Sequence, residues 1–110
     1  MKTDQWKTLT GSEAQQEWAV RIRLLVDQEF DRVAAAFRAV GSKQDPIRRA
    51  ETDSILAILE DKRAEVMGMD RAGYFIQEWQ ELRDQVRRLI VNDPRYQAIK
   101  ADRTRRVRPE

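Results

Sequence analysis

The longest stretch of helical periodicity in the chain lies between Trp18 and Val40, where apolar residues recur three or four positions apart. The residues of this stripe are Trp18, Ile22, Leu25, Val26, Phe30, Val33, Phe37 and Val40. Ser12 is a favourable N-cap, and Gln15 can complete a capping box with it. Gly41 is suited to a C-terminal cap. The pattern predicts one long amphipathic helix over residues 13–40.

Two further helices are expected downstream. Asp45 and Pro46 are typical of a helix start, and the apolar positions that follow predict a helix over 46–67. Its expected apolar face is Ile47, Ala50, Ile55, Ile58, Leu59 and Val66. Lys62 falls on this stripe, where its methylenes can cover apolar surface while its ammonium reaches water. Asp70 can then cap a third helix over 71–91, with Phe75, Trp79, Leu82, Val86 and Leu89 on one side.

Gly68 and Gly73 separate the second and third helices, or else bend one very long helix. We expect a break, because two glycines within a helix cost about 2 kcal/mol relative to alanine. Asn92-Asp93-Pro94 ends the third helix and can start a short fourth element.

The fold class expected from these elements is all-α. We predict an antiparallel bundle of three main helices with a short C-terminal helix and a basic tail. Only four Gly and three Pro occur in 110 residues, too few for a turn-rich β architecture. We expect a single helical domain over residues 1–101 and a flexible basic tail over 102–110.

The first predicted helix is longer than the others and would overhang them by about 10 Å. The lead-in with Trp6 and Leu9, the element with Tyr96 and Ile99, or a second chain could cover the overhang. Trp18 and Trp79 are expected in the core, and Trp6 is expected to be the most exposed tryptophan. We predict self-association, with a dimer favoured. The candidate interface residues are Trp6, Ile22, Val26, Phe30, Val33, Phe37 and Val40.

The sequence lacks the residue types that carry much of enzyme catalysis and metal binding. The chain has no Cys and no His, which removes the usual thiolate and imidazole nucleophiles, bases and metal ligands. Glu78, Glu81 and Asp84 are spaced like carboxylates that could share a cation, but we expect them to face solvent. We therefore predict no enzyme activity, no cofactor and no metal. No apolar run of 18 residues or signal peptide occurs, so a soluble, cytoplasmic protein without a membrane partner is expected.

The basic residues are concentrated at the C-terminus. Residues 1–82 hold 12 Lys/Arg and 15 Asp/Glu, whereas residues 83–110 hold 9 and 4. The last ten residues include Arg103, Arg105, Arg106 and Arg108. These arginines are candidates for non-specific phosphate contacts with nucleic acid, and a solubilising arm is an equally good interpretation. Arg48-Arg49, at an unfavourable place for a helix dipole, hints at an external anion.

Two segments resemble those of a known group of proteins. Residues 11–23 read GSEAQQEWAVRIR, and residues 51–63 read ETDSILAILEDKR. The first resembles a G-S-E-x-Q-x-x-W-A-x-x-I-R segment of small prokaryotic proteins found in phage-like or plasmid-like contexts. The second is similar to their E-T-x-A-x-x-W-I-D-x-R segment, with Ser54 in place of the small apolar residue and Ala57-Ile58 in place of Trp-Ile. The resemblance implies an accessory or mobile-element origin and no known activity.

Together these features predict a helical interaction or assembly module that associates with itself or with an unknown protein partner. The alternative is an accessory nucleic-acid-binding protein that uses its C-terminal arginines. Assembly is the preferred hypothesis, because residues 1–82, which hold most of the predicted bundle, are net acidic.

Overall fold

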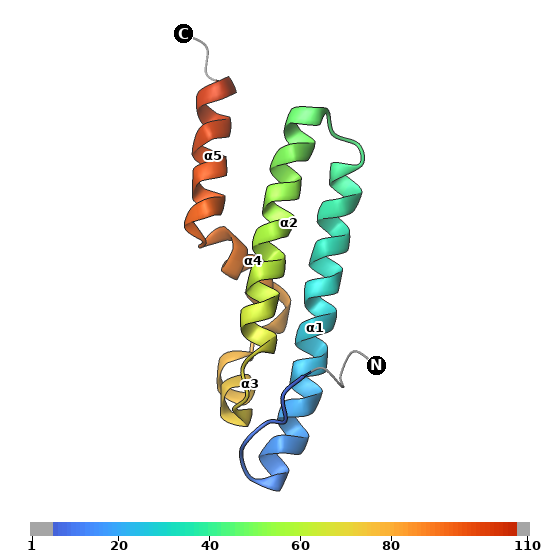
Figure 1. The fold of residues 1–110 in the computed structure, drawn as a ribbon, viewed down its shortest axis with the longest axis vertical. Helices are drawn as coiled ribbons and strands as arrows, with labels where there is room; N and C mark the ends of the chain where they lie inside the picture. The colour runs from blue at the N-terminus through green and yellow to red at the C-terminus, as the bar shows by residue number, and fades with distance from the viewer. Residues whose placement is uncertain (1–5, 108–110) are drawn as a thin grey trace.

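The computed structural model describes residues 6–107, with side chains described for residues 6–105. Within this range the chain forms five helices and no strands, so the all-α prediction is confirmed. The helices are α1 (Glu13–Gly41), α2 (Pro46–Met67), α3 (Ala72–Glu78), α4 (Leu82–Val91) and α5 (Pro94–Val107). The molecule is elongated, with principal extents of 61 × 25 × 19 Å. α1 and α2 form an antiparallel pair along its length (Figure 1).

The first two helices begin where the capping residues predict. The Ser12 hydroxyl accepts a hydrogen bond from the Gln15 backbone N–H at 3.2 Å, and the Gln15 side chain accepts one from the Ser12 N–H at 2.9 Å. Asp45 accepts from the Arg48 backbone N–H at 2.9 Å. Because these side chains satisfy amides that lack partners within the helix, the sequence itself sets both starts.

Arg49, in the first turn of α2, reaches back to the connection between α1 and α2. Its guanidinium donates to the carbonyl of Gly41 at 3.3 Å and to that of Gln44 at 3.2 Å. A cation at this position compensates the negative end of the α1 dipole. Of the two arginines that suggested an external anion, Arg49 therefore has partners within the chain.

The prediction of one helix over 71–91 is wrong, because Trp79–Glu81 separates α3 from α4. Trp79 and Glu81 have non-helical backbone angles, with ψ of 57° and 62°. The Trp79 ring is buried 6.2 Å from the Phe30 ring, and its indole N–H donates to the Tyr74 hydroxyl at 3.2 Å. No Gly or Pro marks this break, so we attribute it to the packing of Trp79 into the core. The break near Gly68 is confirmed, since α2 ends at Met67.

α5 is longer than the short element expected. It continues through Val107, so the described chain shows no helix end at the expected domain boundary after residue 101. Ion pairs fix α5 to α2: Arg95 contacts Asp61 at 2.6 Å, and Arg103 contacts Glu51 at 3.1 Å. Arg103 lies within residues 102–110, which the composition predicted to be a flexible tail, and its pair with Glu51 attaches this part of α5 to α2. Residues 108–110 lie outside the described part of the chain.

Asp93 links the start of α5 to α2. Its carboxylate accepts from the Arg95 backbone N–H at 2.8 Å and lies 3.1 Å from the Lys62 ammonium. The hydrogen bonds from the Arg95 side chain and backbone, with Lys62 beside them, hold the pKa of Asp93 well below its usual range. The Lys62 ammonium thus meets a buried carboxylate, in addition to the water that the sequence suggested.

The lead-in before α1 covers the start of that helix, the first of the three covers considered above. Leu9 is buried and Trp6 is half-buried against the core. The Thr10 N–H donates to the Asp70 carbonyl at 2.7 Å, which ties the lead-in to the connection between α2 and α3. Trp79 is buried as expected, but Trp18 is exposed while Trp6 is half-buried, so the prediction that Trp6 is the most exposed tryptophan is wrong.

Arg23 holds the lead-in from the side of α1. Its guanidinium donates to the Lys7 carbonyl at 2.6 Å and lies 4.9 Å from the centre of the Trp6 ring. Burial lowers the pKa of Arg23 from its ordinary value. Trp6 is therefore positioned by a cation–π contact within the chain.

Candidate interaction surface

α1 carries large apolar side chains on more than one side. Its inner side is buried in the core, yet four large apolar residues between positions 18 and 25 are exposed. Their exposed fractions are 60% for Trp18, 47% for Val20, 42% for Leu24 and 49% for Leu25. Single exposed apolar residues are ordinary, whereas a contiguous group is typical of a contact site.

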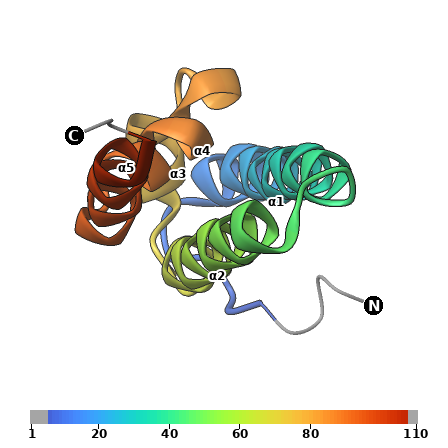
Figure 2. The ribbon, with the colours of Figure 1, turned by 90° about the horizontal axis from the view of Figure 1, so that it is seen from above.

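These four residues lie on or beside one strip along the helix surface. With 3.6 residues per turn, Glu17, Arg21, Leu24, Leu25, Gln28 and Arg32 follow one another along the side of α1 that is turned away from the core. All six are exposed, and we call this strip the outer face of α1. Leu24 and Leu25 form its apolar centre, and Trp18 and Val20 lie at its two edges. Figure 2 shows α1 at one side of the arrangement, with α2 and α4 on its other sides.

Contacts on the inner side fix the rotation of α1. Phe30 is fully buried, and Arg63 of α2 lies 5.6 Å from the centre of its ring. The Arg63 guanidinium also lies 3.6 Å from Asp27, which is buried, and 2.9 Å from Asp31. Breaking a buried ion pair costs about 3–5 kcal/mol, so α1 cannot readily turn its outer face inward.

The interface predicted from the sequence lies mostly inside the chain. Val26, Phe30 and Val33 are buried in the core, because α3 and α4 pack on this stripe. Trp6, Ile22 and Phe37 are half-buried against the same core. Val40 is exposed and lines a shallow pocket of about 230 Å³ between α1 and α4. Within this fold the three buried residues cannot contact a partner.

Sequence reasoning missed Val20 and Leu24 as exposed apolar residues, and it assigned Trp18 and Leu25 to the core. The sequence feature that could have indicated these exposed residues is the number of apolar residues from Trp18 to Val26. There are more of them than one side of a helix can hold. A helix with apolar residues around most of its circumference is usually covered on more than one side.

The candidate phosphate-binding arginines have different surroundings. Arg103 is paired with Glu51, which is buried. Arg105 is exposed on α5. Arg106 belongs to α5, but its side chain lies outside the described part of the structure, as does Arg108 as a whole. Of the two arginines whose side chains are described, Arg103 is therefore occupied within the fold.

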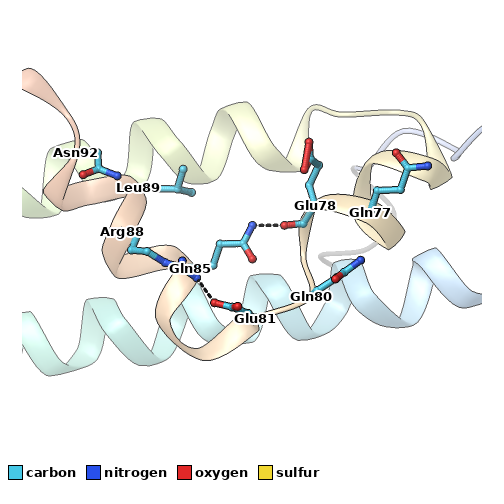
Figure 3. Close-up of a pocket in the computed structure, with 8 residues that line it drawn as sticks. All are labelled: Gln77, Glu78, Gln80, Glu81, Gln85, Arg88, Leu89 and Asn92. Carbon is cyan, nitrogen blue, oxygen red and sulfur yellow. Dashed lines mark hydrogen bonds and ion pairs between the residues drawn. The ribbon is translucent and has the colours of Figure 1, made fainter.

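A polar cleft of about 390 Å³ lies where α3 gives way to α4 (Figure 3). The Gln85 amide donates to the Glu78 backbone carbonyl, and Arg88 pairs with Glu81 at 2.7 Å. Glu81, one of the three carboxylates whose spacing suggested a shared cation, is therefore paired with the Arg88 guanidinium. No cluster of three acidic side chains suited to a metal ion occurs among the described residues.

Comparisons with known proteins assign no role to the outer face of α1. No protein-family model, curated protein or solved structure matches the chain. Over the residues that the structure describes, none of the helices has the length and apolar character needed to cross a membrane.

Proposed function

We propose that the protein is a non-enzymatic helical assembly module that pairs with a second copy of itself through the outer face of α1. The observation that carries the proposal is the exposure of Trp18, Val20, Leu24 and Leu25 within about two turns of one helix. Burial of this group against a partner would remove its apolar surface from water, which favours association.

The composition of the outer face suits a second copy as the partner. Its centre is apolar, and both signs of charge flank it, with Glu17 toward one end and Arg32 toward the other. An apolar centre with a polar rim is the usual anatomy of a protein interface. Two-fold symmetric pairing is the commonest form of self-association, and it requires such a self-complementary surface.

The resemblance of residues 11–23 and 51–63 to small phage-like or plasmid-like proteins supports an accessory role in a mobile element as the setting. In the resembling segment, Ser12 and Gln15 cap α1, while Trp18 is exposed at the edge of the outer face. The segment therefore combines a helix start with a residue type that is common at interface hot spots.

The test is the mass of the protein in solution, measured by light scattering during gel filtration. Leu24→Glu and Leu25→Glu should each give a monomer, because a dimer would bury the new carboxylate. Ile47→Glu is the matched control, since Ile47 is an exposed apolar residue on α2, away from the outer face. All three variants should keep the wild-type helical circular dichroism. A dimer that persists in both leucine variants would refute the proposal.

Nucleic-acid binding is a second candidate function. The C-terminal part of α5 and the α1–α2 turn lie at the same end of the molecule (Figure 1), and this end carries the exposed Lys43, Arg48 and Arg105. Binding to duplex DNA should be independent of sequence and sensitive to salt, with a logarithmic slope of about −0.9 per phosphate neutralised. A combined Arg48→Gln and Arg105→Gln variant should make the slope shallower. An unchanged slope would exclude this surface as the binding site.

A further inference from the structure

The charges on the outer face of α1 specify how two copies would pair. We infer that the two α1 helices pack antiparallel, with the two-fold axis between Leu24 and Leu25, so that Glu17 of each chain faces the partner's Arg32. This inference rests on the proposed self-association and adds its direction and register. It follows from the order of six exposed residues: Glu17, Arg21, Leu24, Leu25, Gln28 and Arg32.

In the antiparallel pair, positions whose numbers sum to the same value lie opposite each other. With the axis between positions 24 and 25, Leu24 faces the partner's Leu25 and Arg21 faces the partner's Gln28. Glu17 then faces the partner's Arg32, and symmetry repeats each contact. The centre is apolar, and two opposite-charge contacts close its ends. Trp18 and Val20 would flank the leucines and extend the buried centre.

A parallel pair places identical residues side by side. Glu17 would face the partner's Glu17, Arg21 the partner's Arg21, and Arg32 the partner's Arg32. Like charges at such spacing destabilise helix pairs, whereas opposite charges support them. The charge order therefore favours the antiparallel direction.

Antiparallel registers displaced by about one heptad are also less favourable. An axis at Arg21 would bring the two Arg21 side chains together and set Glu17 against the partner's Leu25. An axis at Gln28 would set Leu24 against the partner's Arg32. Both place a charge against an apolar side chain, which removes the charge from water without a partner. Of these three registers, only the axis between Leu24 and Leu25 joins the leucines.

Arg32 has one partner within its own chain and remains accessible to a second. Its guanidinium pairs with Glu29 through bonds of 2.9 and 2.5 Å, and its side chain is 55% exposed. A guanidinium has five N–H donors, so the Glu29 contact leaves donors for a second carboxylate. Glu17 of the partner would complete a carboxylate–guanidinium–carboxylate arrangement.

Disulfide formation tests the register directly, because the chain has no cysteine of its own. Arg21→Cys and Gln28→Cys are prepared separately, then oxidised alone and as an equal mixture. A disulfide requires Cα atoms within about 7 Å, and in the inferred register a cysteine at position 21 is displaced along the helix from its own copy by about 10 Å. We expect a cross-linked dimer in the mixture only. Cross-linking of either single variant alone, or of no sample while dimers persist, would overturn the register.

A charge reversal gives a second readout that needs no cysteine. Glu17→Arg would place two arginines together at each end of the interface, and the dimer Kd should rise about tenfold. Asp53→Arg is the matched control, because Asp53 is an exposed acidic residue on α2, away from the outer face of α1. Equal effects of the two reversals would overturn the inferred pairing. A wild-type chain that stays monomeric would instead refute the proposed function.

Discussion

Replacing Leu25 by alanine should weaken the dimer far more than it weakens the folded chain. Leu25 is 49% exposed, so pairing can bury about half of its side chain. Full burial of a leucine contributes about 1.5–3 kcal/mol, and half of that value in each of two chains gives about 1.5–3 kcal/mol per dimer. Because alanine still buries a methyl group, we expect a loss of about 1–2.5 kcal/mol, or a rise in Kd of about 5- to 70-fold.

The assay is sedimentation equilibrium at several loading concentrations, with the Kd fitted for the wild type and for Leu25→Ala. Val40→Ala serves as the control, since Val40 is 55% exposed on the same helix but lies off the outer face. Urea unfolding of each variant separates a change in chain stability from a change in association. A Kd for Leu25→Ala within about twofold of that for Val40→Ala, a difference below about 0.5 kcal/mol, would refute the assignment of Leu25 to the interface.

Three further predictions concern the fold that presents this face. Phe30→Ala should lower the unfolding free energy by about 3–5 kcal/mol in urea titrations, because Phe30 is fully buried against Trp79; a loss as small as that of Phe37→Ala would contradict the core assignment. Gly11→Ala should destabilise by about 1–3 kcal/mol, since Gly11 has φ +144° and the new methyl group would lie 3.1 Å from Ala72; equal melting temperatures for variant and wild type would argue against this turn. Asp93 keeps its charge in the folded chain below about pH 4, where an unfolded aspartate takes up a proton. Its stabilisation is therefore present above about pH 4 and declines as the pH falls further, so Asp93→Asn should lose less stability than the wild type between about pH 5 and 3. Parallel losses in the two proteins would count against the role of Asp93.

The parts of the fold that local chemistry controls were predictable from the sequence. Ser12 and Asp45 satisfy free amides of the first turn, so the starts of α1 and α2 are local properties. The break at Trp79 was not predictable, because it depends on a contact with Phe30, which lies 49 positions earlier in the chain. The length of α5 likewise depends on Arg103 reaching Glu51, a contact that local composition does not indicate.

The sequence indicated an apolar contact surface on α1, but it did not indicate which residues of α1 form that surface. A helical wheel places Trp18 and Leu25 beside the stripe of Val26 and Phe30, and it does not show where the core ends. The buried contact of Asp27 with Arg63 sets the rotation of α1 and leaves Trp18 and Leu25 outside. The predicted interface therefore included core residues such as Val26 and Phe30, and it omitted the exposed Trp18, Leu24 and Leu25.

The most direct test of the central claim is sedimentation velocity of the wild-type chain over a dilution series from about 1 mM to 1 μM, a range that spans dimers of weak to moderate affinity. Self-association through the outer face of α1 predicts a reversible shift toward twice the 13.0 kDa mass of the chain as the concentration rises. A single 13.0 kDa species at every concentration would contradict it.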